Sequence, residues 1–383
     1  MGVKIYHHND PDGYFGAAMC TIIADSLVSD NRHISGENNY SYTEVNYPKV
    51  FPVDEMDEGD LAFIVDVSFG ENTFNQLKQI CEKASHVYWI DHHATSKNEV
   101  VPLLKKEPIA NLDYFVDTRY CGAVNAYLCW KLKMFAKYSV SPFNGQKFVD
   151  NMDPAMIYSW DNVTAYDFKK VGFTFDCLID HIGEYDEKYF RFGIQSEKYI
   201  GDGTLVPYQN KCIGVPVFLV LLDDYDCFKQ LYPESNYFTY GIRNEPLETY
   251  IQFTDDYFFR KTVFKKQIKK YLTNGKAIVD YLMSDYKNGI TNAFEYDFSE
   301  YGGPEKTICI NGRGNSWVFS DLFEKYDMCC LFHYDKNLWA YSIYANPKAL
   351  KNGIDCSKIA KQLGGGGHPG ASGFKTSELI FKK

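Results

Sequence analysis

Histidine and aspartate residues gather in four short segments, each placed just after a stretch that reads as a β-strand. The segments are His7-His8-Asn9-Asp10-Pro11-Asp12-Gly13, Asp66 after the apolar run at 61–65, Asp91-His92-His93 after Trp89-Ile90, and Asp161 within 158–162. In an open parallel sheet the carboxyl ends of the strands meet at one edge, where ligands bind. The spacing therefore predicts that these side chains converge on one site.

Each segment also has a simpler explanation. A turn rich in Asp, Pro and Gly needs no ligand, and Asp66 or Asp161 could cap a helix. The coincidence of four such segments at predicted strand ends favours a shared site. A carboxylate such as Asp66 could bridge two cations about 3.5–4 Å apart. Carboxylate and imidazole ligands without cysteine suit Mn²⁺ or Mg²⁺ better than structural zinc.

The elements that would position these residues alternate along the first 95 residues. Strands are predicted at 4–7, 61–67 and 87–90, and helices at 14–28 and 72–84, the latter with apolar residues at helical spacing. The alternation predicts a parallel sheet with helices on its faces. Residues 113–117 read as a turn before a helix at 122–135. Between 163 and 290 the pattern indicates little beyond one helix at 247–272.

A second, smaller α/β unit is predicted after 299–305, where Ser, Gly and Pro cluster as in a linker. Strands are expected at 307–310, 328–334 and 338–344, and helices at 316–326 and 357–363. The last helix leads into Gly364-Gly365-Gly366-Gly367-His368. One glycine would satisfy a helix C-cap, so four followed by His favour an anion-binding nest of backbone N–H groups.

Composition narrows the function classes. The length of 383 residues fits two domains at roughly 100–200 residues each. The net charge of -10 disfavours binding to long nucleic-acid duplexes, because proteins that bind them usually carry an excess of basic residues. Eleven scattered cysteines without a C-x-x-C pair, no signal peptide and no long apolar run predict a cytoplasmic protein that does not bind membranes. Abundant Tyr and Phe would also fit a phage or viral protein acting in a host cell.

Taken in order, these segments resemble the motifs of the DHH phosphoesterase family. They match its H-x-D-x-D-G, the strand-end Asp, the D-H-H and the later Asp, and residues 364–373 resemble the G-G-G-H-x-x-A-x-G of the DHH-associated domain. The resemblance covers most of 1–165 and 306–383. It implies an α/β fold with a parallel-sheet DHH catalytic domain at 1–298 (core 1–165), a linker at 299–305, and a smaller α/β substrate-binding domain at 306–383. The active site would lie in the cleft between the two domains.

The resemblance also implies a role for each matching residue. The ligands of two divalent cations, Mn²⁺ or alternatively Mg²⁺, would be His8 and Asp10 on one, Asp12, His92 and Asp161 on the other, and Asp66 as the bridge. His93 would contact the phosphate, and Asp91 would orient the neighbouring histidines. The implied substrate-binding residues of the second domain are Gly365, Gly366, Gly367 and His368.

The second domain departs from the family pattern in one strand. Relatives often carry a substrate-contacting Arg in Ser-x-Arg-Ser, where this sequence reads Ser342-Ile343-Tyr344-Ala345. Tyr344 could instead stack on a base. Arg313 is the candidate for the phosphate contact, with an ordinary exposed loop arginine as the equal alternative.

The motif spelling is most like the nanoRNase branch. This implies a metal-dependent phosphodiesterase, an exonuclease that hydrolyses short oligonucleotides to mononucleotides. Water activated by two metals would be the nucleophile, so no Ser or Cys is needed. The alternatives are a cyclic-dinucleotide or bisphosphonucleotide (pAp) phosphohydrolase and, in another class, a non-catalytic nucleotide-binding protein. The expected partner is a short oligonucleotide or dinucleotide, not a long duplex or a membrane, and a homodimer stays open.

Overall fold

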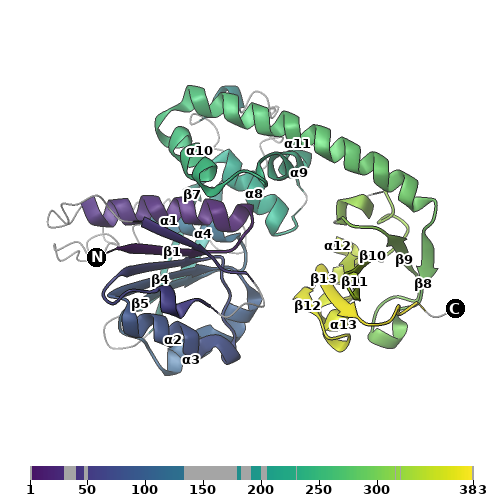
Figure 1. Ribbon diagram of the computed structural model, residues 1–383, viewed down its shortest axis with the longest axis horizontal. Coiled ribbons are helices and arrows are strands. Elements are labelled where there is room, and N and C mark those ends of the chain that lie inside the picture. The colour runs from purple at the N-terminus through teal and green to yellow at the C-terminus, as the bar shows by residue number, and fades with distance from the viewer. Residues whose placement is uncertain are drawn as a thin grey trace. The chain divides into compact units, whose positions relative to one another are not determined.

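The computed structural model describes residues 2–29, 40–46, 51–132, 179–182, 191–199, 205–229, 231–314, 316–319 and 321–381. The chain separates into two compact units, Met1–Lys276 and Ala277–Lys383 (Figure 1). The division falls inside helix α11 (Lys261–Ile290), well before the compositional boundary at 299–305.

A five-stranded parallel sheet forms the core of the first unit. Its order is β2-β1-β3-β4-β5, and every neighbouring pair is parallel. The strands are β1 (Val3–His7), β2 (Tyr40–Glu44), β3 (Leu61–Val65), β4 (His86–Asp91) and β5 (Leu112–Val116). β3 and β4 are buried at every position, as expected of central strands with both faces covered. The predicted α/β class with a parallel sheet is confirmed.

Helices cover both faces of this sheet (Figure 1). Alternate strand residues point to opposite faces, so Ile5 and Phe63 join one core while Tyr6 and Ile64 join the other. The first core also contains residues of α1 (Pro11–Ser29), α4 (Gly122–Lys131), α8 (Val217–Asp226) and α10 (Leu247–Phe259). The second contains residues of α2 (Phe74–Lys83) and α3 (Val101–Lys106).

The first unit also has short connecting elements and a strand pair. One-turn 3-10 helices lie at Val53–Glu55 and Glu71–Thr73, and a π-helical turn lies at Ser96–Val100. β6 (Arg191–Tyr199) pairs antiparallel with β7 (Leu205–Gly214). After α8 comes α9 (Pro233–Ile242). The fourth candidate segment, with Asp161, lies outside the described residues.

A six-stranded mixed sheet forms the second unit, in the order β12-β13-β11-β10-β9-β8. Its strands are β8 (Phe294–Tyr296), β9 (Thr307–Asn311), β10 (Met328–Asp335), β11 (Leu338–Ala345), β12 (Gly366–His368) and β13 (Ala371–Thr376). α12 (Pro347–Lys351) lies between β11 and α13 (Cys356–Gln362). α13 contributes Cys356 and Ile359 to a core with the sheet residues Phe332 and Tyr341. Since β8 pairs with β9, this sheet begins before residue 299, and the proposed linker contains the 3-10 helix Ser299–Tyr301.

Three element assignments from the sequence are wrong. The expected turn at 113–117 is mostly strand β5, because Tyr114, Phe115 and Val116 pair with β4 and bury their side chains. The expected helix at 247–272 is two helices, α10 and α11, which break at Arg260, where φ is -136° and ψ is 58°. The expected helix at 316–326 is a short 3-10 helix at Ser316–Phe319, followed by turns.

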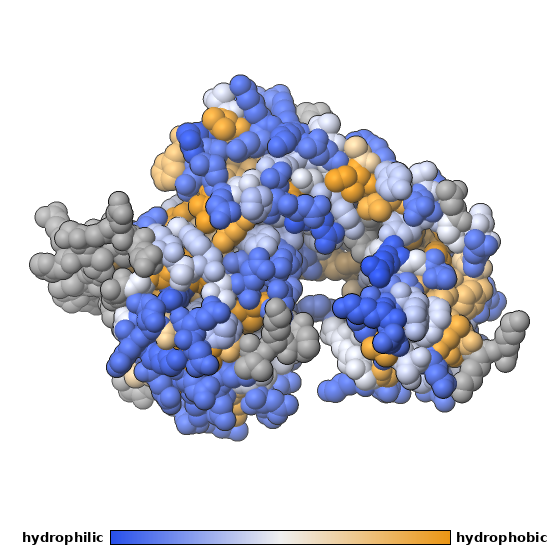
Figure 2. All heavy atoms as spheres, in the orientation of Figure 1, coloured by the Kyte–Doolittle hydropathy of each residue, from blue (hydrophilic) through white to orange (hydrophobic). Residues whose placement is uncertain are grey.

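The visible surface is largely hydrophilic, with separate hydrophobic spots (Figure 2). Exposed large hydrophobic side chains occur on several elements: Leu231, Phe259, Val263, Ile278, Tyr281, Phe294, Tyr334, Leu338 and Leu379. Such exposure is ordinary, since apolar atoms make up much of any protein surface. Within the described ranges, no helix has the length and apolar character needed to cross a membrane.

Candidate metal centre

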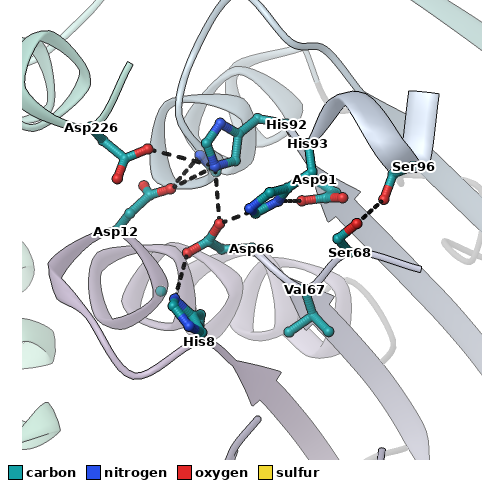
Figure 3. A network of polar contacts seen from close by, with 12 residues as sticks. His8, Asp12, Asp66, Val67, Ser68, Asp91, His92, His93, Ser96 and Asp226 are labelled. Carbon is teal, nitrogen blue, oxygen red and sulfur yellow. Dashed lines mark hydrogen bonds and ion pairs between the residues drawn. The ribbon is translucent and has the colours of Figure 1, made fainter. Parts of the chain in front are cut away.

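Three adjacent strands deliver the candidate ligands to the carboxyl edge of the first sheet. His8 follows β1, Asp66 follows β3, and His92 follows β4. The parallel register aligns the last residues of β1 and β3, His7 and Val65. The segments after these strands therefore begin at the same edge of the sheet. The side chains of His8, Asp66 and His92 point toward one another (Figure 3).

Asp66 lies at the centre of this group. It is 2% exposed, and its backbone has a φ of 56°, a left-handed conformation that Asp tolerates better than most residues. The turn is held because the Asp66 amide donates to the Ile90 carbonyl at 3.0 Å. One carboxylate oxygen lies 3.8 Å from His8 Nδ1, and the other lies 3.0 Å from His92 Nε2. Its two oxygens thus face histidines from two different strands.

His8, Asp10 and Asp66 form the first group able to hold a cation. One donor atom from each lies within 4.8 Å of the other two, and His8 Nδ1 is 2.9 Å from Asp10 Oδ2. The Gly13 amide donates to the other Asp10 oxygen at 2.9 Å. A Cβ at Gly13 would lie 2.1 Å from the His8 carbonyl oxygen, so the glycine of this motif is a steric requirement of the turn.

His92, Asp226 and Cys227 form a second such group. His92 Nε2 lies 3.5 Å from Asp226 Oδ2. The sequence analysis missed Asp226 and Cys227, because they follow no strand. They lie at the end of α8, whose apolar run from Val217 to Leu222 is buried in the first core. The only local signal is that an acidic stretch directly follows this apolar run.

Asp12 is engaged in a way that the sequence did not indicate. Its two carboxylate oxygens accept hydrogen bonds from the amides of Gly122 and Ala123, at 2.7 and 2.8 Å. These amides belong to the first turn of α4, where an anion is favourable. His92 Nε2 lies 3.7 Å from the same carboxylate. The Asp12 carboxylate therefore connects the start of α4 to the metal-binding candidates and stays close to His92.

His93 pairs with Asp91 and also forms, with Asp66 and His92, a third group able to hold a cation. His93 Nδ1 lies 2.7 Å from Asp91 Oδ1, and Asp91 is fully buried. Burial opposes ionisation, but the charge of His93 and its hydrogen bond lower the pKa of Asp91 to about 2. Burial likewise opposes the His93 cation, and Asp91 raises the pKa of His93. The hydrogen bond to Asp91 fixes the orientation of the His93 ring.

Negative charge accumulates at this edge. Burial, followed by the charges of Asp12 and Asp10, raises the pKa of Asp66 well above its usual value. The same causes raise the pKa of Asp226. Among the described residues, the ion-pair partners of Asp66 are histidines rather than lysines or arginines. A bound cation would stabilise the charged form of these buried carboxylates, and the clustered carboxylate and imidazole donors fit divalent metal ions.

The candidate residues of the second unit are placed as follows. The amides of Gly364 and Gly365 donate to α13 carbonyls, while 366–368 pair with β13. A Cβ at Gly365 would lie 2.0 Å from the Gly373 carbonyl oxygen. Helix termination and strand pairing therefore account for much of the glycine run, although Gly366, Gly367 and His368 remain exposed.

Arg313 and Tyr344 differ in their exposure. The Arg313 side chain is exposed, with its Nη2 3.5 Å from Asp335 Oδ1. Tyr344 is 9% exposed, donates to the Gly314 carbonyl at 3.4 Å and lies beside Phe319. Little of the Tyr344 ring is left for stacking on a base.

No family model matches the sequence, and no curated protein matches it. Three similar solved structures have 11–13% sequence identity. A pGpG-specific phosphodiesterase from Vibrio cholerae, 11% identical, has a TM-score of 0.40 over 98% of this chain and 93% of that one. RecJ from Thermus thermophilus in complex with Mn²⁺, 13% identical, has a TM-score of 0.48 over 97% of this chain and 49% of that one. An exopolyphosphatase-related protein from Bacteroides fragilis, 12% identical, has a TM-score of 0.44 over 100% of this chain and 87% of that one.

Proposed function

We propose that the first unit is the catalytic domain of a two-metal phosphodiesterase of the DHH kind. The observation that carries the proposal is the position of Asp66, whose two oxygens face His8 and His92. Each histidine belongs to a different three-donor group. A single buried carboxylate therefore joins two places where a cation fits, which is the arrangement that a two-metal centre needs. The motif order in the sequence supports the same conclusion.

At the first metal position, formed by His8, Asp10 and Asp66, the donor atoms are nitrogen and oxygen. Such donors suit Mn²⁺ or Mg²⁺. We propose His8 and Asp10 as ligands at this position and Asp66 as the bridge. His92 and Asp226 would serve the second position, with Asp12 alongside them. Asp161 stays a prediction.

Two divalent cations at this edge would supply a nucleophile from water and offset the charge on the phosphoryl oxygens. His93 would donate a hydrogen bond from Nε2 to a phosphoryl oxygen. Asp91 would keep the ring in place, because its carboxylate holds Nδ1 at 2.7 Å. The amide of Asp66, bonded to the Ile90 carbonyl, and the α4 amides bonded to the Asp12 carboxylate would keep these two side chains in position.

We propose short oligonucleotides as the substrate, hydrolysed to mononucleotides in the cytoplasm. The net charge of -10 supports a small substrate over a long duplex, and the nanoRNase-like motif spelling supports the same class. Exposed Gly366, Gly367 and His368, with Arg313, would contact the substrate away from the reacting phosphate. A cyclic dinucleotide or pAp is the second candidate substrate.

A substrate panel with Mn²⁺ tests this function. It contains RNA dinucleotides to tetranucleotides, long RNA and DNA oligomers, cyclic dinucleotides and pAp, with Asp66→Asn as the inactive control. We expect kcat/KM to be highest for the short RNA and hydrolysis to be lost in the control. A preference for long RNA would remove the short-oligonucleotide assignment. Nucleotide binding without hydrolysis by the metal-loaded protein would identify a non-catalytic binder.

A further inference from the structure

We propose that Cys227 provides a thiolate ligand at the second metal position, which makes it a mixed sulfur, nitrogen and oxygen site for a thiophilic divalent cation such as Zn²⁺. This inference rests on the proposed function in placing cations at this edge of the sheet. It goes further in stating that the two positions select different metals.

The end of α8 fixes the Cys227 side chain next to Asp226. The Cys227 amide donates to the Asp223 carbonyl at 3.0 Å, which completes the last turn of the helix. Cys227 as a residue is half-buried. Donor atoms of Cys227, Asp226 and His92 lie within 4.8 Å of one another. Because Asp226 and Cys227 are adjacent in sequence, a cation held by Asp226 and His92 has the thiol beside it.

The donor atoms of His92, Asp226 and Cys227 lie within 4.8 Å of one another, which is close to the separations expected around one cation. Zinc binds sulfur at about 2.3 Å and imidazole nitrogen at about 2.0–2.1 Å. Two donors on one such ion are therefore separated by less than the sum of these lengths, about 4.4 Å. For imidazole nitrogen and carboxylate oxygen the corresponding limit is about 4.3 Å, which His92 and Asp226 already meet at 3.5 Å. Three protein ligands with one position left open is the pattern of catalytic zinc sites.

The first position has a different donor set. His8, Asp10 and Asp66 offer nitrogen and oxygen only, which suits harder cations. A thiolate instead favours softer ions, and zinc binds more tightly than manganese at most nitrogen, oxygen and sulfur sites. Binding at Cys227 forms the sulfur–metal bond and releases the thiol proton to solvent. The second position would thus retain Zn²⁺ in the presence of excess Mg²⁺.

Cobalt substitution tests the thiolate directly, because Co²⁺ bound to sulfur has a near-ultraviolet charge-transfer band. We expect this band when Co²⁺ is added to the metal-free full-length protein. It should disappear in Cys227→Ser and persist in the matched variant Cys81→Ser, whose cysteine is buried in α2 on the other face of the sheet. The zinc dissociation constant should rise at least tenfold in Cys227→Ser, about 1.4 kcal/mol, with little change for Mn²⁺.

A second measurement uses the unaltered protein, so it does not depend on whether the variant folds. Alkylation of Cys227, mapped by peptide mass spectrometry, should be blocked by Zn²⁺ but not by Mg²⁺. Co²⁺ binding without the charge-transfer band, or alkylation unaffected by Zn²⁺, would overturn the role of Cys227 and leave the proposed function intact. Failure of both Mn²⁺ and Co²⁺ to bind would instead refute the metal centre itself.

Discussion

Asp66 combines burial, a left-handed backbone and repulsion from neighbouring carboxylates. Each of these costs folding free energy, and burial raises the pKa of Asp66 well above its usual value. A stability optimum would not place a carboxylate there, so the cost is explained by the cations that the residue would bind. The same reasoning applies to Asp226, whose pKa is raised for the same reasons.

Asp66→Asn should stabilise the metal-free protein and abolish turnover. Asparagine keeps the shape and the left-handed turn but removes the buried charge. Thermal unfolding at pH 7 with a chelator should give a higher Tm for the variant than for the wild type. Added Mn²⁺ should raise the Tm of the wild type and leave that of the variant almost unchanged. Asp54→Asn, which alters an exposed aspartate, is the control and should behave as wild type.

The stability of the metal-free protein should also depend on pH through the same group. Because the folded-state pKa of Asp66 is raised, the folded state binds this proton more tightly than the unfolded state does. The contribution of Asp66 to stability is then greatest below its unfolded pKa of about 3.9 and falls as the pH rises toward its folded pKa. The fall should be smaller in Asp66→Asn and in the presence of Mn²⁺, as measured by urea unfolding across this pH range. An equal pH dependence in wild type and variant would contradict the assignment.

Asp91→Asn should lower kcat while leaving metal affinity almost unchanged. The Asp91 carboxylate binds His93, and its loss should cost roughly 10–100-fold in activity, as is typical of residues that orient a functional group. The control is Asp113→Asn, which breaks another histidine–aspartate pair, with His86 at 3.1 Å. Both variants are compared by kcat and by Mn²⁺ titration. An equal loss in the control would reduce Asp91 to a structural role.

At the scale of elements, the site depends on how α4 meets the ends of β1 and β3. Amides in the first turn of α4 donate to the Asp12 carboxylate, and Gly122 lies against both Asp66 and Asp12. A Cβ there would be 2.9 Å from the Asp66 Cβ and 3.1 Å from an Asp12 oxygen. The backbone of α4 can therefore approach the site this closely only because residue 122 is a glycine.

Gly122→Ala should weaken metal binding and activity together. The added methyl group must displace Asp66 or Asp12, and overpacking of this kind costs about 1–3 kcal/mol of stability. The control is Gly289→Ala in α11, where a Cβ would make an ordinary contact of 3.6 Å with Ile310. Helical Gly→Ala changes without strain are usually mildly stabilising. Mn²⁺ titration and thermal unfolding of both variants separate the two effects.

The sequence predicted the parts of the site that depend on local pattern. β1, β3 and β4 are short, mostly apolar runs that lead directly into His or Asp residues. Their positions, and the approach of His8, Asp66 and His92 to one edge, therefore follow from strand alternation. Asp226 could not be found in this way, because a helix distant in sequence brings it to the edge by packing. β5 was missed because Asp113 and Asp117 flank its strand-forming residues and resemble a turn.

At the scale of the whole molecule, the chain devotes its second unit to a sheet that carries none of the proposed metal ligands. Its exposed residues Gly366, Gly367 and His368 lie on the edge strand β12, and Arg313 follows β9. If this unit binds the part of the substrate far from the reacting phosphate, its contacts are made equally in the ground state and the transition state. Their loss should then mainly raise KM.

His368→Ala should therefore weaken the binding of di- to tetranucleotides far more than it slows cleavage of bis-p-nitrophenyl phosphate, which has no distant part to bind. The measurement is kcat/KM for both substrates in wild type and variant, with Lys358→Ala, an exposed change on α13, as the control. We expect kcat/KM to fall at least tenfold on tetranucleotides, which corresponds to about 1.4 kcal/mol. On the minimal substrate kcat/KM should change by about twofold or less. Equal losses on both substrates would place His368 in catalysis or folding. A selective loss would show that the second unit recognises the substrate, because the minimal phosphodiester reports only on the metal centre.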